Sequence, residues 1–361
     1  MSELPAVLHT PFCELVGVRY PIVQTGMGWV AGARLTAATS AAGGLGILAS
    51  TTMTFAQLEA AIGEVRDRTD APFGVNMRAD QDNVDQVADL MIGKGVRLAS
   101  FATAPNEKLI RKLKDAGLVT MPTIAAPRHA EKVVGWGVDA VIAQGHEGGG
   151  HTGAIPTSLL LPQVTSLVDI PVLGAGGFHD GRGLVAALAW GAAGIAMGTR
   201  FLLTQESRVP DEVKARYLIA SLTDTVVTRA IDGQPQRVIR TDLINGLEGH
   251  QGPLALARAG RNALRLRRLT ETSLPSLLRE GLAMRKAGGL TWAQVAMAAN
   301  APMLTRASMV EGHVDSGILP TGQVTGLVDA LPTVAELIES IVAQATATLA
   351  RLAPAPASVT A

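Results

Sequence analysis

Short apolar runs alternate with amphipathic stretches along the first 205 residues of the chain. The apolar runs number eight and span residues 21–28, 45–50, 73–78, 96–102, 118–124, 140–145, 170–177 and 194–202. Runs that are apolar throughout are typical of parallel strands buried on both faces, and the stretches between them have the pattern of helices. Eight such units predict an α/β fold of the (β/α)8 TIM-barrel class. An open doubly wound sheet is the alternative, because a sequence does not show whether a sheet closes.

Helix boundaries are marked most clearly by capping residues and glycine. Thr54 and Gln57 have the spacing of a capping box at the start of one helix, and Gly117 ends another. Thr333 and Glu336 predict a second capping box at the start of an amphipathic helix near the C-terminus. We expect the apolar stripe of that last helix to pack against the barrel.

The alternation stops after residue 205, which divides the chain into four predicted parts. These are a TIM barrel over 14–205, a mainly helical cap inserted after the eighth strand over 206–300, a C-terminal segment and helix over 301–352, and a disordered Pro- and Ala-rich tail over 353–361. Within the cap, residues 258–286 hold eight Lys or Arg against two Glu. That local excess of positive charge is compatible with a phosphate contact or with a solvated helix face.

Composition excludes several functional classes. The chain has 361 residues, 47% of them hydrophobic, and a formal net charge of +0, so it can bury a large core and has no bulk charge to attract nucleic acid or a membrane surface. Its single cysteine, Cys13, cannot form an intramolecular disulfide and suits a reducing compartment. The N-terminus lacks the pattern of a secretory signal, and the uncharged stretch between Arg182 and Arg200 is too short to span a membrane. We expect a cytoplasmic protein; the sequence carries no signal of oligomeric state.

The most informative motif is QGHEGGGHTG, which runs from Gln144 to Gly153. It follows a strand-like run, so a buried strand would open here into a glycine-rich loop. Gly149 and Gly150 have no Cβ and allow a flat ligand to approach the backbone. His151 is the candidate general base, since histidine is suited to proton transfer near neutral pH.

Glycine-rich loops also follow the seventh and eighth predicted strands. The first contains Gly174, Ala175, Gly176 and Gly177, and the second begins with Gly198 and Thr199. Two such loops at these positions form the recurrent phosphate site of TIM barrels, because accessible backbone N–H groups and a helix N-terminus stabilise a dianion. No loop reads G-x-G-x-x-G with an acidic residue about 20 positions on, so a dinucleotide site is not indicated. The alternative is that the glycines serve tight turns only.

Polar groups at other strand ends could surround an isoalloxazine ring. They are Gln24, Thr25, Gly26, Met27, Asn76 and Gln144. Amides and backbone groups can bond the heteroatoms of such a ring, while a methionine packs on its face. The two residues Asn76 and Gln144 could equally be hydrogen-bonded polar groups of the core.

These motifs resemble those of the nitronate monooxygenase, or 2-nitropropane dioxygenase, family of FMN-dependent barrels. The resemblance is carried, in the family's order, by TGMGWVAGARLTAATSAAGGLGILAS, FGVN, QGHEGGGHTG, GAGGFHDG and GTRFLLTQES. The length, the basic insert and the ending TGQVTGLVDALPTVAELIESI are similar to a branch in steroid and cholesterol catabolism. That branch is taken to dehydrogenate a hydroxy-methyl-oxo-octahydroindene-carboxyl-CoA. The family also includes enoyl-thioester reductases and an NADH:quinone reductase.

The resemblance implies roles for individual residues. His151 matches the family's catalytic base. Positions that match the lining of FMN are Gln24, Thr25, Gly26, Met27, Gly28, Asn76, Gln144, Gly149, Gly150, Gly176, Gly177, Gly198 and Thr199. The chain departs from the family by having Gly148 where alanine is common and by an added His146, changes that bear on the substrate. Glu147 is interpreted as structural, and no set of residues has the spacing of a metal site.

The sequence therefore predicts an FMN-dependent oxidoreductase that acts on a small molecule, favoured as an acyl-CoA. In this hypothesis His151 removes a proton next to a thioester or ketone, and hydride leaves the neighbouring carbon for the flavin. The alternatives are nitronate oxidation by oxygen, enoyl-thioester or quinone reduction, and a flavin-binding barrel that serves as an interaction module. Arg265, Arg267 and Arg268 of the basic segment are candidate contacts to the phosphates of CoA.

Overall fold

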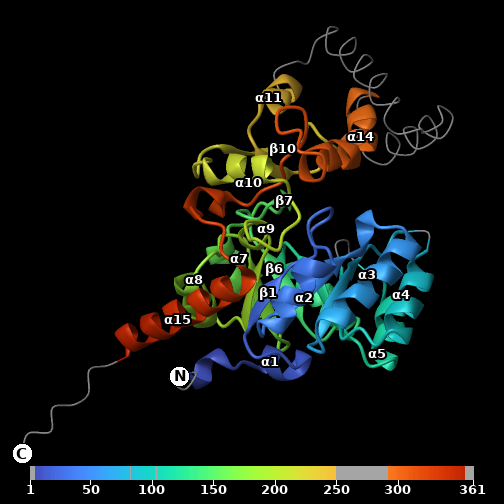
Figure 1. Ribbon diagram of the computed structural model, residues 1–361. Coiled ribbons are helices and arrows are strands. Elements are labelled where there is room, and N and C mark those ends of the chain that lie inside the picture. The colour runs from blue at the N-terminus through green and yellow to red at the C-terminus, as the bar shows by residue number, and fades with distance from the viewer. Residues whose placement is uncertain (1–4, 82, 102–104, 249–291, 354–361) are drawn as a thin grey trace, which may run out of the picture. The chain divides into compact units, whose positions relative to one another are not determined.

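Eight parallel strands close into a barrel in the computed structural model, which describes residues 5–81, 83–101, 105–248 and 292–353 (Figure 1). The strands are β1 (Ile22–Gln24), β2 (Leu45–Ala49), β3 (Phe73–Met77), β4 (Leu98–Phe101), β5 (Val119–Ile124), β6 (Val141–Gln144), β8 (Val172–Ala175) and β9 (Gly194–Met197). β1 pairs with both β2 and β9, so the sheet has no edge. The predicted (β/α)8 class is confirmed, and closure excludes the open sheet.

Helices follow the strands and surround the barrel (Figure 1). They are η1 (Ala6–Leu8), α1 (Pro11–Val16), α2 (Ala33–Ala41), η2 (Ser50–Thr52), α3 (Phe55–Arg68), α4 (Val84–Gly93), α5 (Glu107–Asp115), α6 (Pro127–Gly135), α7 (Thr157–Thr165), α8 (Gly181–Ala189) and α9 (Thr199–Leu202). The capping box at Thr54 is present at the start of α3, with Gln57 as its partner. Gly117 follows α5 in the left-handed region at a φ of 83°, where glycine is favoured.

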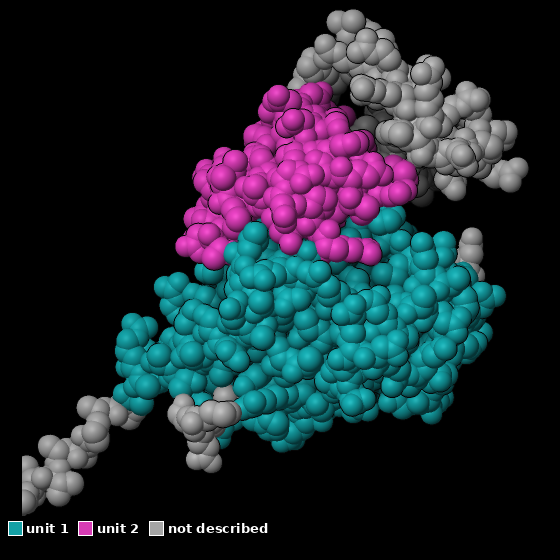
Figure 2. Space-filling model, viewed as in Figure 1, with its two compact units in different colours: residues 1–145, 155–207, 331–361 teal, residues 146–154, 208–330 magenta. Residues whose placement is uncertain are grey.

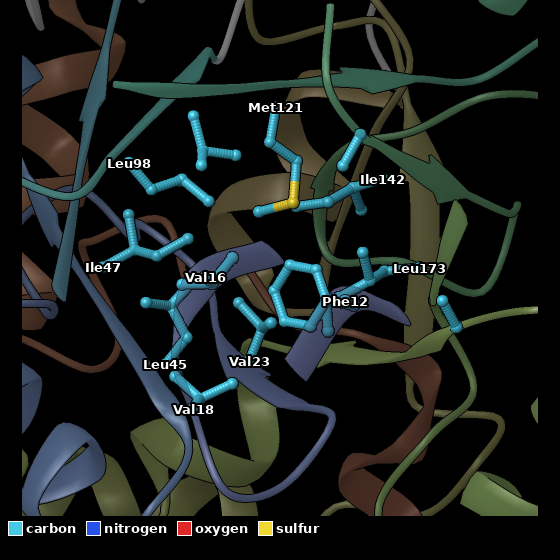
Figure 3. Close-up of a cluster of buried hydrophobic side chains, with 14 of the residues drawn as sticks. Phe12, Val16, Val18, Val23, Leu45, Ile47, Leu98, Met121, Ile142 and Leu173 are labelled. Carbon is cyan, nitrogen blue, oxygen red and sulfur yellow. The ribbon is translucent and has the colours of Figure 1, made fainter. Parts of the chain in front are cut away.

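The interior of the barrel is apolar over most of its length (Figure 3). Val23, Leu45, Leu98 and Leu173 are fully buried there, and each such side chain contributes roughly 1.5–3 kcal/mol by leaving water. The same cluster includes Phe12 of α1. Burial of this cluster holds the strands in place, and the residues of the predicted site lie at the carboxyl-terminal ends of the same strands.

Helix α1 closes the barrel at the amino-terminal ends of the strands. Thr10, just before the helix, donates a hydrogen bond of 2.6 Å to the carbonyl oxygen of Ala193, which precedes β9. Arg97, which precedes β4, donates to the carbonyl oxygen of Val16 at the end of α1. The amino-terminal end of the barrel is therefore closed by a helix, whereas the predicted site residues lie at the carboxyl-terminal ends of the strands.

Helix α15 (Val334–Leu352) is the amphipathic helix predicted near the C-terminus, and it packs on α8 and α2. Its capping box is present, with Thr333 at the N-cap and Glu336 as partner. The first N–H group of the helix, on Val334, donates to Glu206 at 2.9 Å. A Cβ at Gly181 of α8 would lie 2.3 Å from the α15 backbone, so a glycine is needed where the two helices meet.

The chain divides into two compact units, coloured separately in Figure 2. The barrel unit comprises residues 1–145, 155–207 and 331–361, and the second unit comprises residues 146–154 and 208–330. This division differs from the predicted one in two places. The glycine-rich loop after β6 belongs to the second unit, as do residues 301–330.

The described part of the second unit contains a three-stranded antiparallel sheet as well as helices. Its strands are β7 (Gly150–His151), β10 (Thr225–Thr228) and β11 (Gln236–Ile239), and its helices are α10 (Asp211–Leu218), α11 (Asp242–Glu248), α14 (Trp292–Met309) and η3 (Gln323–Leu327). The prediction of a mainly helical cap missed the hairpin formed by β10 and β11. Its first strand reads TVVT, in which every residue is β-branched, and Gly233 in the connection is left-handed, so local preference agrees with a hairpin.

Residues 258–286 and the tail beyond 353 lie outside the described residues. Within the described ranges, no helix is both long enough and apolar enough to cross a membrane.

Candidate active site

Polar side chains form the layer of the barrel interior nearest the carboxyl ends of the strands. Leu98 and Ile142 belong to the apolar core, and side chains two positions apart on a strand face the same side. Ser100 and Gln144 therefore face the interior as well. Asn76 pairs with Ser100 across β3 and β4, and its Nδ2 donates to the serine Oγ at 3.3 Å. The apolar core thus gives way to hydrogen-bonding groups at the end where barrel active sites lie.

The loop after β1 passes very close to this polar layer. A Cβ at Gly26 would lie 2.3 Å from the Cβ of Asn76, so only glycine fits at this point. A Cβ at Gly198, after β9, would lie 3.3 Å from both the Met27 Sδ and the Thr25 Oγ1. The structure therefore brings predicted residues from three strand ends together, and Thr199 follows as the first residue of α9.

The side chain of Gln24 is fully buried at the end of β1. Its Nε2 donates to the carbonyl oxygens of Thr25 and Ile47, the second at 3.1 Å. Its Oε1 accepts no hydrogen bond from the described residues. Strand alternation places this side chain on the face opposite to Val23, which lies in the barrel core. A buried acceptor without a donor costs roughly 1–3 kcal/mol.

Backbone strain marks the same loop. Trp29 has a φ of 65°, and among the described residues no other non-glycine residue has a positive φ. Its N–H donates to the Thr52 Oγ1 at 3.1 Å, and a Cβ at the neighbouring Gly28 would lie 3.0 Å from the Thr52 Cγ2. A left-handed conformation costs a non-glycine residue on the order of 1–3 kcal/mol and is concentrated at functional sites. No local sequence pattern predicts this conformation of Trp29.

The glycines at the end of β8 and in the loop after it have different roles. Gly176 and Gly177 are both left-handed, with φ of 91° and 85°, and the carbonyl oxygen of Gly176 accepts a bond of 2.9 Å from the Thr157 hydroxyl. Gly174 instead serves packing, because a Cβ there would lie 2.8 Å from the ring of Phe178. The adjacent residue, Ala175, is part of the barrel core.

The N-terminus of α8, which was predicted to share in the phosphate site, already has a carboxylate cap. Asp180 accepts a bond of 2.9 Å from the Gly183 N–H and another of 2.7 Å from the Arg182 Nε. Burial acts to raise the pKa of Asp180, but these two donors and the nearby His179 outweigh it and hold that pKa below its usual value. The prediction that a phosphate binds here therefore depends on the backbone of Gly176 and Gly177, and not on the N-terminus of α8.

His151 lies in β7 of the second unit and pairs in register with Gln236 of β11. Its Nε2 lies 2.8 Å from the Asp232 Oδ2, and the Gln236 Nε2 donates to the same oxygen. The other oxygen of Asp232 accepts the N–H of Gln234 at 3.0 Å. The side chain of His151 is 65% exposed and that of Asp232 is 19% exposed. We call His151, Asp232 and Gln236 the His151 cluster.

Asp232 is held as a carboxylate. Burial acts to raise its pKa, but the hydrogen bond and charge of His151, together with the donors of Gln234 and Gln236, outweigh burial and lower the pKa. The cluster therefore combines an exposed imidazole with an ionised, half-buried partner. That arrangement is typical of an oriented general base.

The loop that carries His151 is anchored through its backbone. Arg237, which is buried, donates two bonds to the carbonyl oxygen of His146, at 3.3 and 3.1 Å. The His146 ring lies 2.8 Å from the carbonyl oxygen of Gly153 within the same loop. A Cβ at Gly149 would lie 2.4 Å from the backbone of Thr321, which gives this glycine a packing role in addition to its predicted one.

Glu147 differs from His151 in its surroundings. Its carbonyl oxygen accepts the N–H of Gln323 at 2.9 Å. Burial lowers the pKa of Arg237, and the charge of Glu147 acts in the opposite direction. Glu147 thus offsets the charge of a buried arginine, in keeping with a structural carboxylate.

Sequence reasoning missed Asp232 and Gln236. The segment IDGQPQR, residues 231–237, shows only a turn signal, and its link to His151 crosses 81 positions of the chain. Arg265, Arg267 and Arg268 lie outside the described residues, so their predicted contacts to CoA stay a prediction. In the part of the chain that the structure describes, no three His, Cys, Asp or Glu side chains gather in a way that could hold a metal ion.

A closed parallel barrel with a polar carboxyl-terminal layer and a carboxylate-paired histidine on the loop after β6 defines an enzyme of the TIM-barrel class. The model of the nitronate monooxygenase family matches residues 9–344. The chain belongs to that family. Membership indicates a flavin cofactor.

Two relatives are similar over nearly their whole length. One, from Rhodococcus jostii (strain RHA1), is named (3aS,4S,5R,7aS)-5-hydroxy-7a-methyl-1-oxo-octahydro-1H-indene-4-carboxyl-CoA dehydrogenase; it is 57% identical over 340 residues, covering 94% of this chain and 96% of the relative. A protein of the same name from Mycobacterium tuberculosis (strain ATCC 25618 / H37Rv) is 57% identical over 341 residues, with the same coverage. The structure of FabK from Thermotoga maritima matches with a TM-score of 0.77 and 35% identity, covering 95% of this chain and 98% of that one. The family and both named relatives catalyse oxidation–reduction, and the chain is an oxidoreductase.

Proposed function

We propose that this protein is an FMN-dependent dehydrogenase of an alicyclic acyl-CoA. The observation that carries the proposal is the 57% identity, over nearly all of both chains, to two relatives whose names specify a fused-ring carboxyl-CoA as the substrate of a dehydrogenase. Agreement over whole chains at that level favours the same substrate class. The His151 cluster supplies the oriented base that removal of hydrogen next to a thioester requires.

The residues of the barrel unit fit a flavin. Gly26 leaves no room for a side chain beside Asn76, and Gly176 and Gly177 keep side chains away from the predicted phosphate. FMN would be held by residues of the barrel unit, namely Gln24, Thr25, Gly26, Met27, Gly28, Asn76, Gln144, Gly176, Gly177, Gly198 and Thr199. We favour FMN over FAD because the sequence has one phosphate signature and no adenosine-binding one. Bound FMN would supply the acceptor for a hydride.

The chain's own part in the reaction is proton transfer. His151 takes the proton from the carbon next to the thioester carbonyl, where the carbonyl makes the C–H bond acidic. The electron pair of that bond forms a double bond to the neighbouring carbon, from which the hydride leaves. The substrate loses one proton and one hydride and becomes an enoyl thioester, while His151 becomes an imidazolium.

Nitronate oxidation is the second candidate, favoured by the name of the family whose model spans residues 9–344. A nitronate is the anion that remains when a nitroalkane loses its carbon-bound proton, so the same histidine would take that proton when the neutral nitroalkane is the substrate. The two candidates differ in the group that activates the carbon, a thioester in one and a nitro group in the other.

Anaerobic mixing of the flavin-loaded protein with each substrate class separates these candidates. The test uses a saturated alicyclic carboxyl-CoA, its free carboxylic acid as a control for the thioester, and an alkyl nitronate. We expect the flavin absorbance to bleach rapidly with the CoA thioester alone. Rapid bleaching with the nitronate alone would replace the proposed function by the second candidate.

A further inference from the structure

We propose that Asp232 and Gln236 position His151 so that Nδ1, and not Nε2, is the ring nitrogen that receives the substrate proton. This inference rests on the proposed function, in which His151 is the general base. It concerns how that base is oriented and which of its atoms reacts.

The sheet of the second unit brings the three side chains together. His151 of β7 and Gln236 of β11 are directly opposite each other in an antiparallel pair, and side chains of such pairs lie on the same face. Asp232 is in the connection between β10 and β11, where its Oδ1 accepts the Gln234 N–H. The turn therefore fixes the carboxylate, and the register fixes the histidine beside it.

The chemistry of the donors sets the tautomer of the imidazole. An ionised carboxylate can only accept, so the contact of 2.8 Å between the Asp232 Oδ2 and the His151 Nε2 requires a proton on that nitrogen. A neutral imidazole with a proton on Nε2 has its lone pair on Nδ1. The nitrogen that can take a proton from the substrate is then Nδ1.

Gln236 reinforces this assignment. Its Nε2 donates to the same Asp232 oxygen and lies 3.1 Å from the His151 Nε2. The two nitrogens are neighbours because both donate to one acceptor. The reverse orientation of the amide would place its oxygen against the carboxylate, which puts two acceptors in contact. Gln236 therefore helps to hold the carboxylate in the position from which it binds His151.

The pair also stabilises the product of proton transfer. The imidazolium that forms on His151 lies beside a carboxylate whose side chain is only 19% exposed, where water screens the attraction less than at an open surface. Carboxylates that orient metal-binding histidines are typically worth about 10-fold to 100-fold in activity, and we expect the same order of magnitude for Asp232.

The Asp232→Asn variant tests the proposal while sparing the turn. An asparagine keeps an oxygen that can accept the Gln234 N–H but loses the negative acceptor for His151. Asp224→Asn is the matched control, because the Asp224 carboxylate also accepts a backbone N–H of its own turn, from Ser221. The rate of anaerobic flavin reduction by the acyl-CoA is measured for wild type, both variants, His151→Ala and the Asp232→Asn/His151→Ala double variant.

We expect Asp232→Asn to slow flavin reduction by about 10-fold to 100-fold and Asp224→Asn to leave it unchanged. If Asp232 acts only through His151, the Asp232→Asn change causes no further loss in the His151→Ala background. An equal loss in both backgrounds would indicate a structural role and overturn the proposal. A wild-type rate for Asp232→Asn together with a slow His151→Ala would overturn it while leaving the base in place.

A second readout does not depend on activity. Two-bond ¹H–¹⁵N correlation spectra of protein labelled at histidine report which ring nitrogen carries the proton, and His151→Ala identifies the His151 signals. We expect a proton on Nε2 in wild type and a shift toward the other tautomer in Asp232→Asn. A proton on Nδ1 in neutral wild-type His151 overturns the proposal even if Asp232→Asn fails to fold. A wild-type rate for His151→Ala would overturn the proposed base itself, and this inference with it.

Discussion

At the residue scale, the loop after β6 carries two groups capable of acid–base chemistry, and their environments differ. His151 is 65% exposed and is oriented by Asp232. Glu147 acts electrostatically on the buried Arg237, and its backbone is tied to Gln323. A group that offsets a buried charge is poorly suited to exchange protons with a substrate, because its protonation would leave that charge without compensation. We therefore propose His151, rather than Glu147, as the residue that transfers the proton.

Replacement of His151 by alanine should separate chemistry from cofactor binding. We expect His151→Ala to keep its flavin and to slow flavin reduction by the acyl-CoA by about 10² to 10⁴, the usual contribution of a general base. Glu147→Gln should cost less. Rates come from anaerobic stopped-flow absorbance, and flavin content comes from the spectrum of the purified protein. An inactive Glu147→Gln beside a fully active His151→Ala would reverse the two roles.

The lowered pKa of Asp232 makes a prediction about stability and pH. Because the pKa in the folded state lies below the value of roughly 3.9 in the unfolded state, the ionised side chain stabilises the fold above that unfolded value. The stabilisation is lost as the pH falls through the folded-state pKa. Urea unfolding of wild type and Asp232→Asn should therefore differ at pH 7 and converge in strong acid. A difference that grows on acidification would contradict the assignment.

At the scale of elements, the loop after β8 combines conformation with the absence of side chains. Gly177→Asp should abolish flavin retention, because it adds a Cβ at a φ of 85° and a negative charge where a phosphate is predicted. Gly117→Asp is the matched control, since Gly117 has a φ of 83° and open space around it at the end of α5. The measurement is flavin content after purification. Full retention in Gly177→Asp, or equal loss in both variants, would contradict the predicted phosphate site.

Elements that form locally or repeat regularly could be predicted from the sequence. Each of the eight barrel strands lies within its predicted apolar run, and both capping boxes are present, because burial on two faces and capping leave local signals. The sheet of β7, β10 and β11 could not be predicted in the same way. β7 has two residues, and its partner Gln236 lies 85 positions after His151. The position of Asp232 beside His151 depends on that pairing, so the sequence predicts His151 as the base without indicating its partner.

At the scale of the whole molecule, the barrel unit is assembled from three separate stretches of chain. The first ends one residue after β6, and the short excursion of residues 146–154 carries His151 before the chain re-enters the barrel unit at Ile155. Residues 331–361 complete that unit through α15, which packs on α8 and α2. The chain thus runs directly from Gln144, at the end of β6, to His151, the proposed base. The chain passes from one unit to the other after residues 145, 154, 207 and 330. The regular alternation of strands and helices in the sequence does not indicate these points.

Removal of one proton and one hydride from an acyl-CoA can be followed in a single anaerobic turnover. Protein containing FMN is mixed with a saturated alicyclic carboxyl-CoA in the absence of oxygen, and the thioester is recovered and analysed by mass spectrometry. We expect one enoyl-CoA, lacking two hydrogens, for each flavin reduced, and almost none with His151→Ala on the same timescale. Recovery of unchanged acyl-CoA from the wild-type protein, with the flavin still oxidised, would contradict the proposed function.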